Sequence, residues 1–299
     1  MPTLDNLVDQ TLGMFTAFTG ATDQVCYLLT DMTADDLSTR LSDPGHVGRG
    51  LYEIDNELIY AASGDTTNGA LTIAPFGRGQ QSSVPAAHTA GTKVTRAPRV
   101  PRARAIQMLN QAIAGLYPDL FVVKSDESQT AKLLRWGYPL PAEAEEVLDV
   151  KYRTPPFSNW VGVRQWRIDN ASDTADYPPG RSISIGSPMW PGAPIKITYV
   201  ARPKPLVSGS DDWAATTGLP DSASDLAVLW AAERLVSADE LLRTQTRTVE
   251  QSQRGTVSPA GAAANASRLM HQQYTERLAV EKRALQAKYG LPRLIRSWT

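Results

Sequence analysis

The stretch from Asp221 to Tyr289 constrains the fold most, because its apolar residues recur at helical spacing over two long segments. Ser222 or Ser224 can cap the first helix by accepting a backbone N–H. The spacing i, i+3, i+4 of one buried helix face is met at Val228, Ala231, Ala232, Leu235, Ala238 and Leu242. The pattern therefore predicts a first helix with a single core-facing stripe.

A second helix is predicted from about Asn265 to Lys288. Its apolar stripe is narrow, and Glu281 interrupts it. Such a polar helix needs a partner surface on one side only, or neighbours from other chains. Gly255, Pro259 and Gly261 are poor helix formers, so residues 251–264 are expected to be a mobile connector. Two ordinary core helices of a globular domain remain the alternative.

Charge is balanced overall but uneven along the chain. The 299 residues are 42% apolar and 20% charged, with a net charge of −1, which is typical of a globular protein large enough for two domains. Residues 1–98 hold five basic and eleven acidic residues, whereas residues 222–299 hold eleven basic and seven acidic ones. The composition argues against nucleic-acid binding by bulk positive charge.

The single cysteine, Cys26, excludes an internal disulfide and a cysteine-based metal site. It lies in an expected strand, where a buried inert thiol is the usual outcome. We see no signal peptide and no apolar run near the ~20 residues of a membrane span. We therefore expect a protein that is assembled in the cytoplasm, with no membrane partner.

Helical and extended segments alternate along the rest of the chain. Residues 4–19 have helical spacing, and so do Arg102–Tyr117. Between them, the hairpin Leu51–Tyr60 is expected to turn at Asp55-Asn56, because both residue types tolerate positive φ. Strands are expected at Gln24–Thr30, Gly50–Ile54, Leu58–Ala62, Ala70–Ala74, Thr92–Arg96, Glu146–Tyr152, Trp160–Ile168, Arg181–Ile185 and Pro194–Val200.

These patterns predict an α+β fold. We expect a helical bundle with an N-terminal small antiparallel β module and a second, inserted antiparallel β-sandwich-like module, in which Trp160, Trp166 and Trp190 supply core bulk. The expected parts are an N-terminal helix (1–20), a small β module (21–98), a bundle helix (99–118), the second β module (119–205), a helical hairpin (206–290) and a C-terminal anchor tail (291–299).

Residue types that carry chemistry are scattered. His46, His88 and His271 show no metal-ligand spacing, and each is expected to be a surface or turn histidine. Gly77-Arg78-Gly79 lacks the Lys-Ser/Thr ending and the helix of a phosphate loop. No G-x-S-x-G motif occurs. The sequence thus predicts no catalytic residue, no metal and no cofactor, and we do not expect an enzyme.

One group of motifs resembles a module that is frequent in virion proteins of tailed phages. It combines the "I-D-x-E" hairpin in Leu51–Tyr60, the strand Gly69–Ile73, the turn Arg78-Gly79, and the segment Ala86–Val94, which reads "A-A-H-x-A-G-x-x-V". Gly79 and Gly91 permit tight turns, and His88 could bond a loop carbonyl. The chain departs from the pattern at Ala74–Phe76 and in the long run Gln80–Pro85.

A second group resembles head-to-tail adaptor (connector) proteins of tailed phages. It comprises "I-x-I-x-Y-x-A-x-P" at Ile195–Pro203, Leu219-Pro220, "A-A-E-R-L" at Ala231–Leu235, Glu240 with Arg243, and the final amphipathic helix. The resemblance implies a structural virion protein that forms a homo-oligomeric ring, typically a dodecamer, below the portal. The ring would join capsid to tail, contact a tail-side connector or tail terminator protein, and let DNA pass without specific binding during genome ejection.

The resemblance also implies that the C-terminal segment engages the portal protein. The tail is too apolar for a solvated end, and Arg293 and Arg296 could pair with acidic portal groups. Docking of the tail on its own domain is the alternative. The residues expected to bind the portal are Leu285, Tyr289, Arg293, Leu294, Ile295, Arg296 and Trp298.

Two other functions fit parts of the sequence. A tail or baseplate component would also carry the histidine-containing β module, but it leaves the helical C-terminal half unexplained. A carbohydrate-binding or hydrolytic β protein would use Trp160, Trp166 or Trp190 as a stacking platform.

Overall fold

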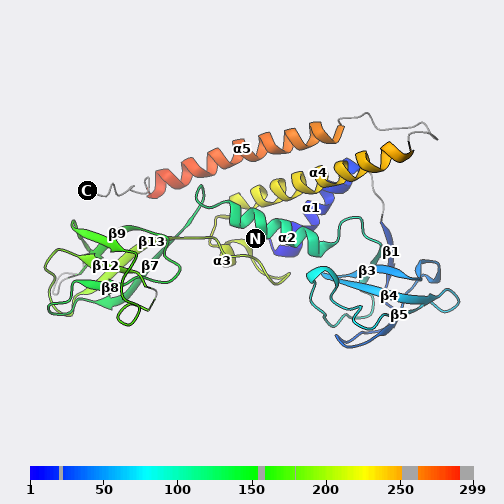
Figure 1. Ribbon diagram of the computed structural model, residues 1–299, viewed down its shortest axis with the longest axis horizontal. Coiled ribbons are helices and arrows are strands. Elements are labelled where there is room, and N and C mark those ends of the chain that lie inside the picture. The colour runs from blue at the N-terminus through cyan, green and yellow to red at the C-terminus, as the bar shows by residue number, and fades with distance from the viewer. Residues whose placement is uncertain (20–22, 154–158, 179, 251–261, 290–299) are drawn as a thin grey trace. The chain divides into compact units, whose positions relative to one another are not determined.

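The computed structural model describes residues 1–19, 23–153, 159–178, 180–250 and 262–289 (Figure 1). These residues form a mixed α+β fold with several antiparallel sheets, as the sequence predicted. The chain divides into two compact units. Unit 1 holds residues 1–113, 205–216 and 220–280, and unit 2 holds residues 114–204, 217–219 and the chain from 281 onward.

A six-stranded antiparallel sheet in unit 1 has the strand order β1-β6-β3-β4-β5-β2. Its outermost strands also meet, because Leu28 bridges Leu41 and the Ser42 N–H donates to the Tyr27 carbonyl at 2.8 Å. The sheet therefore curls into a small barrel around an apolar interior. The strands are β1 (Gln24–Tyr27), β2 (Ser38–Arg40), β3 (Gly50–Ile54), β4 (Glu57–Asp65), β5 (Ala70–Ile73) and β6 (Lys93–Arg96), with short 3-10 helices η1 (Pro44–His46) and η2 (Gln80–Ser82) between them.

Turn chemistry in this barrel follows the sequence prediction. β3 and β4 form the expected hairpin, in which Ile54 pairs with Glu57 and Asp55 has a φ of 52°. Gly79 and Gly91 also have positive φ angles, of 64° and 86°. All five strands predicted here are present, and β2 was missed. Cys26 is buried in β1, as expected, and burial raises the pKa of its thiol to about 11.

The helices are α1 (Leu4–Thr19), α2 (Arg102–Gly115), α3 (Trp213–Thr217), α4 (Ser224–Glu250), which follows the 3-10 turn η3 (Asp221–Ala223), and α5 (Ala262–Tyr289). The predicted N-terminal helix is confirmed at residues 4–19, and it packs against α4 (Figure 1). The expected connector falls mostly outside the described residues, but residues 262–264 belong to α5.

Polar contacts hold the segment between Leu206 and Trp213 against the other helical elements of unit 1. Asn110 of α2 donates from its side chain to the Leu206 carbonyl at 2.8 Å and accepts the Leu206 N–H at 2.9 Å. Trp213 is fully buried, donates from its indole to the Pro220 carbonyl, and also donates its backbone N–H to the Pro2 carbonyl. These contacts hold the segment that returns from unit 2 against α2, through Asn110, and against the residues before α1, through Trp213.

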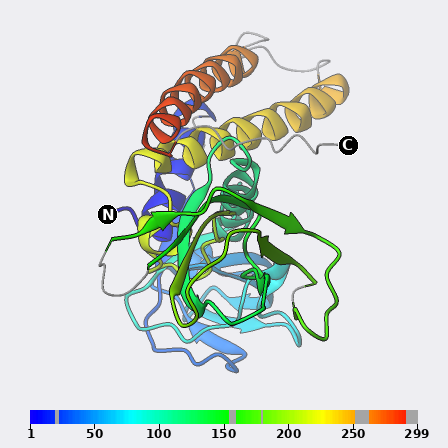
Figure 2. The same cartoon turned by 90° about the vertical axis from the view of Figure 1, so that its left-hand side faces the viewer.

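Unit 2 contains two antiparallel sheets, of order β10-β9-β13-β7 and β11-β12-β8 (Figure 2). Their buried residues share one apolar interior, to which Tyr138, Ile183 and Ile197 contribute. The strands are β7 (Val122–Thr130), β8 (Gly137–Pro139), β9 (Glu146–Tyr152), β10 (Val161–Gly162), β11 (Trp166–Asp169), β12 (Ser182–Ile185) and β13 (Pro194–Ala201).

The expected role of the tryptophans in this interior is wrong for Trp190. This residue is 69% exposed, because it lies in the proline-bounded loop between β12 and β13 and outside any strand register. Trp166 packs against the interior from its edge. Trp160 is partly exposed, and Arg153 and Lys196 lie over its ring at 5.3 and 5.6 Å.

The Asn110 contact gives a stability prediction. We expect Asn110→Ala to lower the free energy of unfolding by roughly 2–4 kcal/mol, because it leaves the buried N–H and carbonyl of Leu206 without partners. Urea denaturation measures the change. Gln111→Ala, at the exposed neighbouring position on α2, should shift the midpoint little. Equal effects of the two variants would contradict this role of Asn110.

Candidate functional site

Residues of the motif group between Leu51 and Val94 meet at one buried carboxylate, that of Glu57 at the start of β4. Its side chain is 1% exposed, yet it accepts five hydrogen bonds. One oxygen accepts from Arg78 Nε at 2.7 Å and from the Gly79 N–H at 3.1 Å. The other accepts from Arg78 Nη2, from the Ala86 N–H and from His88 Nε2, at 2.8, 3.0 and 2.9 Å. Burial of this charge is offset by a complete set of donors.

The Arg78 guanidinium uses all of its N–H groups. Besides its two bonds to Glu57, it donates from Nη1 to the carbonyls of Thr33 and Asp36 at 2.8 and 3.1 Å. Nη2 also donates to the Ala86 carbonyl at 2.6 Å. Arg78 thus ties three loops of the barrel together, a task that needs the planar five-donor fork of arginine.

His88 completes this cluster, which we call the Glu57 hub (Asp55, Glu57, Arg78 and His88). Its Nδ1 lies 2.9 Å from Asp55 Oδ2 and its Nε2 lies 2.9 Å from Glu57 Oε2. Ionised carboxylates only accept, so both ring nitrogens carry protons and the imidazole is charged. Two positive and two negative groups make the hub neutral.

The pKa shifts of Glu57 and His88 agree with an ionised carboxylate and a charged imidazole. Burial would raise the pKa of Glu57, but hydrogen bonds from Arg78, His88 and Ala86 outweigh it and hold the pKa at about 2. Burial would lower the pKa of His88, and the bonds to Glu57 and Asp55 reverse this, so its pKa lies above the ordinary value.

Two sequence expectations are therefore corrected. His88 is not a surface or turn histidine, because its side chain is 2% exposed, and it contacts two carboxylates where a loop carbonyl was expected. His46 does lie in a turn, bonded to Asp43, and His271 is exposed on α5. In Gly77-Arg78-Gly79, which the sequence does not predict to be a phosphate loop, all Arg78 donors bond to groups of the protein.

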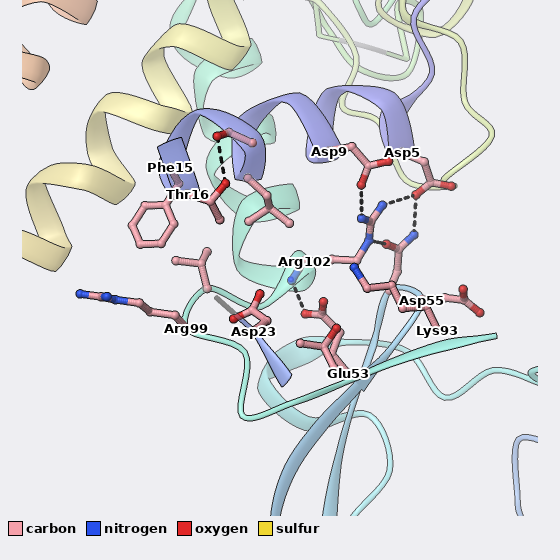
Figure 3. A pocket seen from close by; sticks show the side chains of 15 residues that line it. Asp5, Asp9, Phe15, Thr16, Asp23, Glu53, Asp55, Lys93, Arg99 and Arg102 are labelled. Carbon is pink, nitrogen blue, oxygen red and sulfur yellow. Dashed lines mark hydrogen bonds and ion pairs between the residues drawn. The ribbon is translucent and has the colours of Figure 1, made fainter. Parts of the chain in front are cut away.

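A pocket of about 680 Å³ lies beside the hub in unit 1, and sequence reasoning missed it (Figure 3). α1, β3, β6 and the segment that leads to α2 line it. Most of its polar groups are charged, and they come from residues distant in sequence, so no local motif marked them. The charged lining residues are Asp5, Asp9, Asp23, Glu53, Asp55, Lys93, Arg99 and Arg102.

Arg102 organises one wall of this pocket. Its guanidinium contacts Asp9 and Asp5 of α1 and donates from Nε to Asn56 at 2.8 Å (Figure 3). Its backbone N–H, the first of α2, donates to Glu53 Oε2 at 2.6 Å. Glu53 thus acts as a cap for α2, and Arg102 links that helix start to α1 and to the β3–β4 turn.

Glu53 is the titratable group of the pocket. Burial raises its pKa to about 7, against the lowering effects of the Arg102 N–H and guanidinium. The pocket can therefore bind and release a proton near neutral pH. The described residues that line it include no serine, cysteine or histidine.

Other chemical sites were sought across the described residues. No group of histidine, cysteine and acidic side chains among them could hold a metal ion. No helix in the described ranges is long and apolar enough to cross a membrane.

Only part of the expected portal-binding set can be placed. Leu285 is half-buried and Tyr289 is exposed, both at the end of α5. Arg293, Leu294, Ile295, Arg296 and Trp298 lie outside the described residues.

Comparisons with known proteins give no relative. No protein-family description matches the chain, and neither the curated proteins nor the solved structures contain a match.

The geometry of the hub predicts that even a charge-conserving substitution of Arg78 lowers the free energy of unfolding substantially. Arg78→Lys keeps the charge but cannot supply five planar donors, so we expect a loss of about 3 kcal/mol in the free energy of unfolding. Arg40→Lys on the exposed face of β2 should cost little. Denaturation of both variants tests this, and equal stability of the two would show that the fork geometry is unimportant.

Stability should also depend on pH through the hub. The contribution of Glu57 is present above pH 4.5 and is lost as the pH falls through about 2. That of His88 is present below pH 6.5 and is lost as the pH rises through its raised pKa. The stabilising contributions of Glu57 and His88 are both fully present between pH 4.5 and pH 6.5. The stability difference between wild type and His88→Gln should therefore shrink at alkaline pH, and a pH-independent difference would contradict a charged His88.

Proposed function

We propose that this chain is a head-to-tail adaptor of a tailed phage. It is a structural virion protein that forms a ring, typically a dodecamer, below the portal, joins capsid to tail and lines the DNA exit channel. The observation that carries the proposal is the exposure pattern of α5, because this long helix is only partly covered by its own chain.

α5 contacts α4 mainly through polar pairs. Ser267 meets Ser237 at 3.1 Å, His271 meets Glu233 at 3.3 Å and Arg277 meets Asp225 at 2.8 Å. Among the apolar residues of α5, Ala266 and Met270 are buried, while Leu269 and Val280 are about half exposed. A helix with apolar residues on an uncovered side suits a tube in which neighbouring copies supply the missing contacts.

The proposal also covers how the helices and sheets are arranged in the ring. α1, α2, α4 and α5 would form the central bundle of the ring. The barrel of unit 1 and a sandwich-like arrangement of β7–β13 in unit 2 would be modules carried by that bundle. The buried Glu57 hub supports a structural role for the phage-like module, since every group in it is paired within the protein.

Charge supports passage of DNA without tight binding. The chain has a net charge of −1, and its first 98 residues hold eleven acidic against five basic residues. A channel that attracted phosphates strongly would retain the genome, so a near-neutral ring suits ejection. A tail-side connector or tail terminator protein would bind the opposite side of the ring.

The alternative functions have less support. A tail or baseplate component would explain the barrel but not α5. A glycan platform built from Trp160, Trp166 and Trp190 needs several open ring faces. Cations lie over Trp160 and Trp166 packs on the interior of unit 2, so Trp190 is the one member of the three that is largely exposed.

Portal binding tests the proposal. We expect deletion of residues 291–299 to abolish co-elution with the portal ring in size-exclusion chromatography, because the tail supplies Arg293, Arg296 and Trp298. The single change Trp298→Ala should weaken binding by roughly 2 kcal/mol or more if the residue is an interface hot spot.

Ser297→Ala serves as the matched control within the same segment and should bind as wild type does. The circular dichroism and the denaturation midpoint of the deletion variant should be unchanged. Full portal binding by the deletion variant would contradict the anchor assignment, and no binding by the wild type would contradict the adaptor function.

A further inference from the structure

Two loops at one end of unit 2 expose a cluster of large apolar side chains, which we call the basic tip. The loop between β7 and β8 presents Leu133, Leu134 and Trp136, and the loop between β12 and β13 presents Trp190. Leu134 is 85% exposed and Leu133 is 75% exposed. Exposure of four such residues in two adjacent loops marks an interaction surface.

Hydrogen bonds hold the basic tip in one shape. The Ala131 N–H donates to the Ala193 carbonyl at 2.8 Å, and the Ile185 N–H donates to the Trp136 carbonyl at 2.8 Å, so the two loops are joined at both ends. The Tyr138 hydroxyl donates to the Arg135 carbonyl and accepts the Lys132 N–H. A preorganised loop loses little conformational entropy when it binds a partner.

Backbone strain at Leu134 also indicates that the basic tip is an interaction surface. This bulky residue has a φ of 61°, in the left-handed region that non-glycine residues rarely adopt. Strain of this kind persists where the surrounding contacts enforce it and is concentrated at functional sites. Beside it, a groove of about 160 Å³ is lined by both loops, which is small for a drug-sized ligand but fits a single protein side chain.

The basic tip is also free of negative charge in the segments that form it. The two loops, residues 131–136 and 186–193, contain Lys132 and Arg135 and no acidic residue. Lys132, Arg164 and Arg167 are exposed, and the bond from the Gly186 N–H to the Gln165 carbonyl places Arg164 beside the second loop. The surface therefore suits a partner that is both apolar and acidic.

Unit 1 carries a surface of that chemistry, which we call the acidic wall. Val25, Tyr27 and Leu29 are exposed on alternate positions of β1 and the residues after it, and Tyr27 and Leu29 are 51% and 55% exposed. The Leu29 N–H donates to the Arg40 carbonyl, so β2 lies directly alongside. Residues 23–43 contain five acidic residues and one basic residue, and β6 adds Lys93 opposite Tyr27, so the surface has a net negative charge with basic groups beside it.

We propose that the basic tip of one copy docks on the acidic wall of a second copy of this chain. The two surfaces are different, so the contact is head-to-tail and repeats from copy to copy. Such a contact closes into a ring when the rotation between copies permits. Ring closure rests on the proposed function, whereas the contact itself rests only on the two surfaces.

Complementation between two defective variants tests the contact without any portal protein. A tip variant (Leu134→Asn and Trp190→Ser) keeps the wall, and a wall variant (Tyr27→Thr and Leu29→Thr) keeps the tip. Asparagine tolerates the backbone at position 134, and threonine suits a strand. Val207→Ser, at another exposed apolar residue of unit 1, is the control.

We expect wild type and the control to self-associate with rising concentration in native mass spectrometry, more strongly at low salt. Each variant alone should associate roughly 100-fold more weakly, since two central apolar contacts are lost. An equimolar mixture of the two variants should form a 1:1 dimer and nothing larger, because one intact tip then meets one intact wall.

Three outcomes would overturn the proposal. The first is a wild type that remains monomeric at every concentration and does not sediment with vesicles. The second is a mixture of the two variants that fails to dimerise. The third is a wild type that stays monomeric but sediments with phosphatidylglycerol vesicles through its tip, which would make the occupant an anionic bilayer. None of these outcomes depends on portal binding, so the adaptor function is judged separately.

Discussion

The N-terminal unit depends on one buried charge, the carboxylate of Glu57. An ionised group in a protein interior is tolerated only with near-complete hydrogen bonding. Arg78, His88 and two backbone N–H groups supply it, all from residues 78–88, and Arg78 also bonds the carbonyls of Thr33 and Asp36 in a distant loop. Removing one partner would leave an unpaired buried charge, so these loops are fixed together and hold the barrel in one geometry.

Much of the fold could be predicted from local patterns. Helical spacing located α1 and α2, and Asp55-Asn56 marked the hairpin turn, because these signals depend on residues close in sequence. The burial of His88 could not be predicted, since it depends on Glu57 from another strand. Trp190 was misplaced because composition does not distinguish a core tryptophan from one exposed by proline-bounded loops.

A common property links the candidate sites. Glu57, Arg78 and His88 of the hub are buried and pair their polar groups within unit 1, whereas α5, the basic tip and the acidic wall leave apolar groups uncovered. A chain that pairs its buried charges so completely and yet exposes Leu134 and Trp190 has surfaces suited to other chains. The proposed assembly role rests on this contrast.

The most direct measurement is the native mass of the purified protein, alone and after mixing with its portal ring. The account predicts weak, concentration-dependent oligomers of the protein alone and a ring of fixed copy number on the portal. The copy number should match the symmetry of the portal, since each copy contacts the next through the same surfaces. A protein that stays monomeric and does not bind the portal would contradict the account.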